Sequence, residues 1–209
     1  GYNTDSLGCE CTLKKIKNKI KKILIIGCGG AGKACVVTAK NKYPKAKIYI
    51  FNRNLSKLKK FTKKIKTNKK NIEILKNNSD LKKINNLNLI INTTSLGFDL
   101  ELKSIKSNLK YFSPISYGAI DIERVKTTDD LNLLLLRNII DTMDLLKRNS
   151  RTSIFDIIYK PSETVLMNIG KNLGLKTFNG LEMNFMQAVE AFKITNKNIK
   201  IAKIKRVMR

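Results

Sequence analysis

A short glycine-rich segment, GCGGAG at residues 27–32, has the residue types and spacing of a loop that holds a pyrophosphate. An apolar run precedes it and a helical pattern follows it, which is the context that such a loop needs. We expect Gly27 to allow the tight turn, Gly29 to let a phosphate approach the backbone and Gly32 to let the helix pack against the strand. The N–H groups at the start of the helix then point at the anion. The alternative is a glycine-rich turn that binds nothing.

Two cationic side chains follow the next expected strand, at a place where they could determine whether NAD or NADP is bound. The segment FNRNLSK at residues 51–57 contains Arg53 and Lys57 but no carboxylate. A carboxylate at this place typically binds the ribose 2′-hydroxyl of NAD, whereas an arginine accommodates the 2′-phosphate of NADP. Arginine is scarce in this lysine-rich chain, so Arg53 is more informative than Lys57. The pattern predicts NADP as the cofactor.

A third polar segment, NTTS at residues 92–95, ends the fourth expected strand. Ligands of open α/β sheets bind beyond the carboxyl ends of the strands, so Thr93 and its neighbours could line a nicotinamide pocket. The same residues could equally form an ordinary polar turn.

The chain contains no histidine, which excludes several classes of chemistry. Ser-His-Asp triads, Cys-His pairs and histidine-containing zinc sites all require an imidazole. The four cysteines, at positions 9, 11, 28 and 35, match no metal-binding spacing, so we predict no metal site. So few cysteines in 209 residues are typical of a reducing compartment, and we expect a cytoplasmic location or an organelle with a reducing interior.

Alternating strand and helix patterns position these residues. The expected strands are 22–27, 47–51, 72–75, 87–92 and 154–159. The expected helices are 5–19, 30–42, 55–66, 79–84, 162–173 and 181–194. This alternation predicts the α/β class, with a Rossmann-like, doubly wound parallel sheet flanked by helices. In the last helix we expect Leu181, Phe185, Val189 and Phe192 to form the core stripe, which leaves Gln187 outside it.

We divide the chain into four parts. Residues 1–20 form a linking helix, and residues 21–97 with 154–194 form the NADP-binding domain. Residues 98–153 are expected to be an insertion, partly helical or mobile, with a helix at 131–147. Residues 195–209 form a basic tail, helical or frayed.

The net charge of +26 suggests a polyanion as an alternative partner. However, lysines are scattered from Lys14 to Lys205 rather than clustered, so we expect no specific nucleic-acid partner. No apolar run reaches the length of a membrane span, and we expect no membrane partner.

Six motifs together resemble the C-terminal half of shikimate dehydrogenase, and they occur in that family's order. They are GYNTDSLG at 1–8, GCGGAGKA at 27–34, NRNLSK at 52–57, NTTSLG at 92–97, DIIYKPSET at 156–164 and NGLEMNFMQAVEAF at 179–192. The resemblance implies NADPH-dependent, reversible reduction of 3-dehydroshikimate to shikimate in the biosynthesis of chorismate and aromatic amino acids.

The resemblance also assigns roles to residues. For the cofactor it implies Gly27, Cys28, Gly29, Gly30 and Ala31 at the pyrophosphate, Asn52, Arg53 and Lys57 at the 2′-phosphate end, and Ile157 and Gly180 at the nicotinamide. For the substrate it implies Asp5, which is also catalytic as half of a Lys–Asp pair, together with Tyr159 and Gln187. From the sequence alone, Asp5 could instead cap the first helix, and Tyr159 could be a half-buried tyrosine at a strand end.

The family's N-terminal substrate domain, with its catalytic lysine, has no counterpart in these motifs. The implied partners are therefore a small-molecule substrate and that domain, fused upstream or separate, and we expect this chain alone to be inactive. Two alternatives stay open. One is an inactive basic binding or scaffold module on a Rossmann fold, and the other is a quinate/shikimate dehydrogenase that uses NAD.

Overall fold

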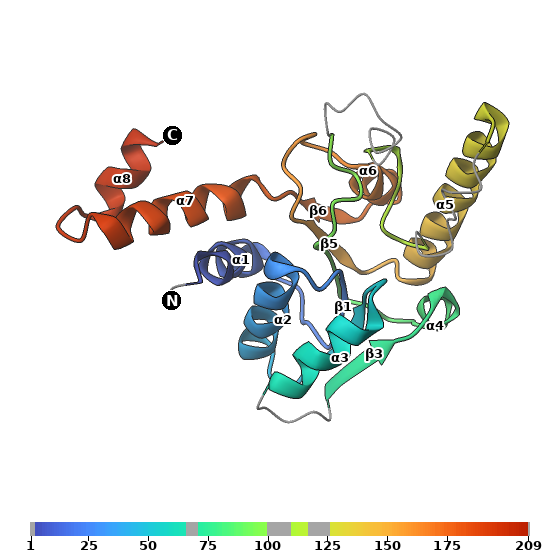
Figure 1. Cartoon of the computed structure of the whole chain (residues 1–209), viewed down its shortest axis with the longest axis horizontal. Helices are drawn as coiled ribbons and strands as arrows, with labels where there is room; N and C mark the ends of the chain where they lie inside the picture. The colour runs from blue at the N-terminus through green and yellow to red at the C-terminus, as the bar shows by residue number, and fades with distance from the viewer. Residues whose placement is uncertain (1–2, 66–70, 100–109, 117–125, 209) are drawn as a thin grey trace.

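The computed structural model describes residues 3–65, 71–99, 110–116 and 126–208, and its core is one parallel sheet (Figure 1). The strands are β1 (Lys22–Ile26), β2 (Lys47–Phe51), β3 (Ile72–Leu75), β4 (Leu89–Asn92), β5 (Ser153–Asp156) and β6 (Lys176–Phe178). Their order is β3-β2-β1-β4-β5-β6, and every neighbouring pair is parallel. The α/β, Rossmann-like fold is confirmed.

The order of strands reverses between β1 and β4, because the chain passes outward from β1 to β3 and then returns to the other side of β1. Such a switch point leaves a crevice outside the carboxyl ends of the two central strands. The glycine-rich segment follows β1 and the NTTS segment ends β4, so the fold brings both to this crevice.

Helices cover both faces of the sheet. They are α1 (Thr4–Lys15), α2 (Gly30–Lys42), α3 (Leu55–Lys64), α4 (Asn78–Lys82), α5 (Thr128–Arg148), α6 (Val165–Asn172), α7 (Leu181–Thr195) and α8 (Ile201–Val207). Side chains of α1, α2, α3 and α7 pack with Ile23 and Ile25 of β1 on one face. Side chains of α4, α5 and α6 pack with Leu24 and Ile26 on the other. Because β1 is buried on both faces, its continuous apolar run is the pattern expected of a central parallel strand.

Several expected boundaries differ from the structure. The first helix ends at Lys15 rather than Lys19, because Ile16 is extended. The strand expected to reach Tyr159 ends at Asp156, and the helix expected from residue 162 begins at Val165, capped by the Thr164 side chain. Strand β6 was not expected, since three residues are too few for a recognisable alternation.

The core stripe expected for the last helix is wrong in part, because Val189 is buried as expected but the rest of the stripe is not. Met183, Met186 and Val189 are the buried residues of α7, whereas Leu181 is 60% exposed and Phe192 is 42% exposed. The reason is that α7 packs against α1 and extends beyond the edge of the sheet, as Figure 1 shows. At the contact, a Cβ on Gly8 of α1 would lie 2.4 Å from the Met183 carbonyl oxygen, so glycine permits the close approach.

The range 98–153 contains α5, which lies between β4 and β5 in the chain and packs against α6. Its expected helix at 131–147 is observed at Thr128–Arg148, while 100–109 and 117–125 lie outside the described residues. No helix in the described ranges combines the length and the apolar content that crossing a bilayer demands.

Candidate functional site

The junction of β1 and α2, residues 27–32, has two glycines that the fold requires and two that leave the backbone open. Gly27 has a φ of +103°, and a Cβ there would lie 2.5 Å from the Thr93 hydroxyl. A Cβ on Gly32 would lie 2.7 Å from the Gly27 carbonyl oxygen, so the helix approaches the strand as the spacing predicts. Nothing lies within 4 Å of a Cβ placed on Gly29 or Gly30. The start of α2 therefore presents bare backbone amides to an anion.

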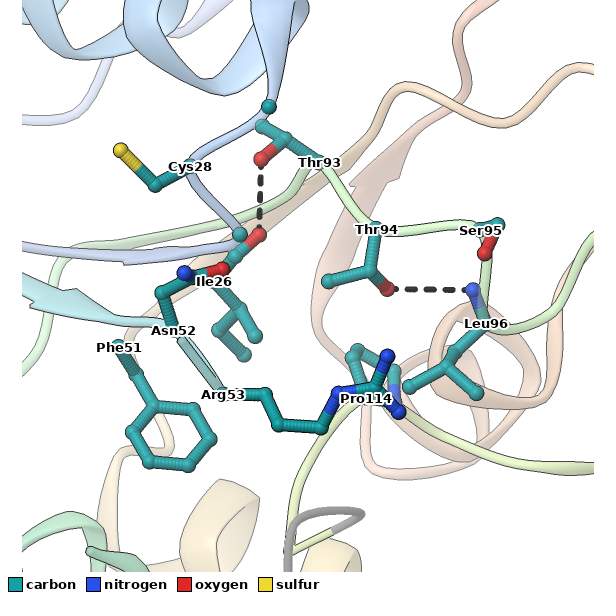
Figure 2. A pocket seen from close by; sticks show the side chains of 12 residues that line it. Ile26, Cys28, Phe51, Asn52, Arg53, Thr93, Thr94, Ser95, Leu96 and Pro114 are labelled. Carbon is teal, nitrogen blue, oxygen red and sulfur yellow. Dashed lines mark hydrogen bonds between the residues drawn. The ribbon is translucent and has the colours of Figure 1, made fainter. Parts of the chain in front are cut away.

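Thr93 ties the end of β4 to this loop. Its backbone N–H and its hydroxyl both donate to the carbonyl oxygen of Ile26, at 2.8 Å and 2.9 Å. The hydroxyl bond is the upper dashed line in Figure 2. Two segments far apart in the sequence are thus joined at the switch point of the sheet.

A pocket of about 280 Å³ opens beside the loop. Its wall comes from the end of β1, the end of β2, the segment after β4 and one residue of a later loop. The lining residues are Ile26, Gly27, Cys28, Gly29, Phe51, Asn52, Arg53, Thr93, Thr94, Ser95, Leu96 and Pro114. Figure 2 shows the Arg53 side chain reaching from the end of β2 toward Leu96 and Pro114. The pocket thus combines open backbone amides with an exposed guanidinium.

The residues around Arg53 shape the start of α3. Asn54 caps this helix by accepting a hydrogen bond from the Lys57 N–H at 3.0 Å, and the Asn52 side chain donates to the Asn54 carbonyl oxygen at 2.8 Å. These bonds fix the turn from which Arg53 projects. Lys57 is exposed on the first turn of α3.

The pocket unites some of the residues expected at the cofactor but not all of them. Those in its wall are Gly27, Cys28, Gly29, Asn52, Arg53 and Thr93. Those outside its wall are Gly30, Ala31, Lys57, Ile157 and Gly180. The last two contact each other in the loops after β5 and β6, where the Gly180 N–H donates to the Ile158 carbonyl oxygen at 2.9 Å.

Pro114 is a lining residue that no motif indicated. The buried Asn138 of α5 holds its segment, because the Asn138 amide accepts from the Ser113 N–H at 2.8 Å and donates to the Ser113 and Ile115 carbonyl oxygens. The range expected to be an insertion therefore contributes to the pocket wall. The signal that could have been used is Asn138 itself, an amide that follows the apolar run Leu133–Leu136 in the expected helix.

The three residues expected at the substrate do not form one cluster of contacts. The Gln187 side-chain amide of α7 donates to the Asp5 carboxylate of α1. Asn3, rather than Asp5, caps α1, so the capping role considered for Asp5 is wrong. Tyr159 lies in the loop after β5, 43% exposed, with its ring edge-on to Phe98 at 6.3 Å. It is therefore not a strand-end residue.

Asp156, at the end of β5, is a fully buried carboxyl beside the pocket wall. It accepts hydrogen bonds from the Asn92 side chain at 3.0 Å, the Ile158 N–H at 3.1 Å and the Thr164 hydroxyl at 2.8 Å. Burial raises the pKa of Asp156 to about 6, and the three hydrogen bonds oppose that rise.

This raised pKa predicts how stability depends on pH. A carboxyl with a higher pKa in the folded chain binds its proton more tightly there, so its stabilising contribution is complete below about pH 4 and lost as the pH rises to about 6. The relevant quantity is the free energy of unfolding of the wild type minus that of the Asp156→Asn variant. This difference should fall by about 3 kcal/mol at most between pH 4 and pH 7. Urea unfolding of both proteins at several pH values measures this difference. A difference that stays flat or grows with pH would contradict the prediction.

The fold and the pocket together define a class: a Rossmann-like α/β unit with a cleft at its switch point that is lined by open backbone amides and a guanidinium. The family model described as shikimate/quinate 5-dehydrogenase matches residues 10–106. Shikimate dehydrogenase (NADP(+)) of Aquifex aeolicus is 31% identical over 198 residues, which cover 94% of this chain. The enzyme of the same name from Methanocaldococcus jannaschii is 30% identical over 211 residues, which cover 97% of this chain.

The structural comparison agrees. The crystal structure of shikimate dehydrogenase from Aquifex aeolicus superposes with a TM-score of 0.61 at 27% identity, covering all of this chain and 62% of that one. The chain is thus a relative of the shikimate dehydrogenases, and the resemblance to their C-terminal half is confirmed. It spans 56% and 61% of the length of the two curated relatives.

Proposed function

We propose that this chain is the NADP-binding half of a shikimate dehydrogenase, which reversibly reduces 3-dehydroshikimate to shikimate with NADPH. The observation on which the proposal rests is that Gly29 and Arg53 line the same pocket at the switch point of the sheet. Open backbone amides suit a pyrophosphate, and a guanidinium suits a terminal phosphate.

The choice of NADP over NAD rests on the end of β2. Arg53 lines the pocket there, and Asn52 beside it is uncharged. A guanidinium can make two parallel hydrogen bonds to a phosphate, whereas a carboxylate at this place would repel it. The names of the two curated relatives, both NADP(+) enzymes, agree with this choice.

The other expected residues keep their assignments within the proposal. Gly27 to Ala31 hold the pyrophosphate, and Lys57 adds a positive charge near Arg53. Thr93 lies at the wall beneath the nicotinamide, while Ile157 and Gly180 approach it from the loops after β5 and β6. Their mutual contact supports a shared role for the last two.

Asp5 and Gln187 form the proposed substrate-binding pair, with Tyr159 as a third contact. The paired carboxylate and amide offer an acceptor and donors to the hydroxyl groups of a polyol acid. The bound cofactor supplies or accepts the hydride. Asp5 orients the substrate hydroxyl and a lysine of the partner domain, and that lysine takes up the hydroxyl proton as the alcohol is oxidised.

The proposal includes a partner. The relatives are longer than this chain, so the substrate domain that supplies the lysine is either fused upstream or a separate polypeptide. We propose no specific nucleic-acid or membrane partner, and a reducing compartment such as the cytoplasm, in keeping with four unpaired cysteines.

The catalytic part of the proposal predicts that the 209-residue chain binds NADPH but oxidises shikimate with NADP⁺ at a negligible rate. The reason is that the lysine, which moves the proton, belongs to the other domain. Following NADPH absorbance with excess shikimate measures this rate. A robust shikimate-dependent rate from the purified chain would contradict it.

The net charge of +26 favours one other candidate, a basic binding module that has kept only the fold. Charge-driven binding falls steeply with salt and needs no pocket. Titrations with NADPH and with an oligonucleotide, each at low and high salt, separate the two functions. Saturable NADPH binding supports the dehydrogenase half, whereas oligonucleotide binding alone, abolished by salt, supports the basic module.

A further inference from the structure

Two buried polar side chains face each other across the ends of β4 and β5, behind the wall of the pocket. Asn92 and Asp156 are register partners in the sheet, and both side chains are fully buried. None of the roles assigned above uses either of them. Burying an amide and a carboxyl side by side costs free energy unless each makes hydrogen bonds. The hydrogen-bond partners of the two side chains therefore show which segments they hold in place.

Asn92 fixes the segment that forms the pocket wall after β4. Its side-chain oxygen accepts from the Thr94 N–H at 3.0 Å and from the Thr94 hydroxyl at 2.8 Å. Its side-chain nitrogen donates to the Leu96 carbonyl oxygen at 3.2 Å and to Asp156 at 3.0 Å. The Thr94 hydroxyl in turn accepts from the Leu96 N–H at 3.2 Å, the second dashed line in Figure 2. One amide therefore sets the shape of the Thr93–Leu96 wall.

Asp156 joins that amide to the loop after β5. The oxygen that accepts from Asn92 also accepts from the Ile158 N–H, and the other oxygen accepts from the Thr164 hydroxyl. Ile158 lies between Ile157 and Tyr159, and Thr164 caps α6. All three donors are uncharged, and an ionised carboxylate can accept from all of them at once.

The two segments also touch directly. Gly97, which ends the segment after β4, has a φ of +100°, and a Cβ there would lie 3.1 Å from the Cβ of Thr164. The two loops thus pack without space for another side chain. The hydrogen bonds of Asp156 and this contact hold the loops as one unit.

We propose that Asp156, acting through Asn92 and Thr164, is a positioning residue that fixes the two loops forming the nicotinamide end of the cleft. The inference rests on the proposed function, because that function places the nicotinamide near Thr93, Ile157 and Gly180. It goes further by separating the cleft into two ends. Arg53 and the glycine loop hold the phosphates, while the Asp156 network sets the wall against which the nicotinamide lies.

Titrations with two ligands, followed by fluorescence or calorimetry, test this separation of the cleft into two ends. NADPH occupies both ends of the cleft, whereas adenosine 2′,5′-bisphosphate reaches only the phosphate end near Arg53. We expect Thr164→Val, which removes the hydroxyl without changing the side-chain shape, to weaken NADPH binding about fivefold. Asp156→Ala should weaken it about tenfold or more. Binding of adenosine 2′,5′-bisphosphate should stay within about twofold of the wild type in both variants.

Thr164→Ser is the matched control, since it keeps the hydroxyl that Thr164→Val removes and should bind NADPH as the wild type does. A thermal melt identifies any variant that does not fold. If Asp156→Ala does not fold, the comparison of Thr164→Val with the wild type tests the proposal. Equal weakening of both ligands, or no weakening of either, would overturn the positioning role. If neither ligand binds the wild-type chain, the proposed function itself fails, which is a distinguishable result.

Discussion

Replacing Gly180 by alanine should lower the free energy of unfolding by about 3 kcal/mol or more. A Cβ at this position would lie 1.7 Å from the carbonyl oxygen of Ile157 and 2.3 Å from its carbonyl carbon. Both are backbone atoms, so no change of side-chain rotamer relieves the clash. The loop after β5 must move, which breaks the hydrogen bond from the Gly180 N–H to the Ile158 carbonyl oxygen.

Gly30→Ala is the matched control for this substitution. Nothing lies within 4 Å of a Cβ on Gly30, and that residue begins α2, so alanine should leave stability unchanged or raise it slightly. Urea denaturation followed by circular dichroism compares the two variants. If Gly180→Ala is as stable as Gly30→Ala, the close approach of Ile157 and Gly180 does not exist in solution.

The second large effect concerns affinity. Arg53→Ala should weaken NADPH binding by about ten- to a hundredfold, because a charge-assisted hydrogen-bond pair to a phosphate contributes roughly 1.5–3 kcal/mol. NADH lacks the 2′-phosphate, so its affinity should change little. Arg53→Lys should recover only part of the loss, since an ammonium keeps the charge but lacks the fork of two donors.

Lys63→Ala, on the last turn of α3, is the control that removes the same charge from an exposed position outside the pocket. It should alter NADPH affinity by less than about threefold, as expected for a screened charge. An equal loss in Arg53→Ala and Lys63→Ala would mean that total charge, rather than the pocket, determines NADPH binding.

The sequence predicted that the glycine-rich loop and the end of β2 meet at one edge of the sheet, because both follow from local patterns. A buried strand, the glycine spacing and the start of α2 are consecutive, and Arg53 follows directly after the next strand. In a parallel sheet, adjacent strands end at the same edge, so neighbouring loops meet without further information. Arg53 and Gly29 do line one pocket.

The proposed nicotinamide end depends on contacts between distant segments, which periodicity does not show. Asn92 and Asp156 are 64 positions apart, and their pairing follows only from the order of the strands. Pro114 enters the wall because Asn138 of α5 holds its segment. The stripe expected for α7 failed in part for a related reason, since α7 packs mainly against α1.

The most direct test of the account is the affinity of the unmodified 209-residue chain for NADPH and for NADH, measured by calorimetric titration at one ionic strength. The account predicts saturable binding at one site, with NADPH bound at least about tenfold more tightly than NADH. Binding of NADH with equal or greater affinity would favour an NAD-dependent quinate/shikimate dehydrogenase. The absence of saturable binding for either nucleotide would contradict the central claim that the cleft between Gly29 and Arg53 is a cofactor site.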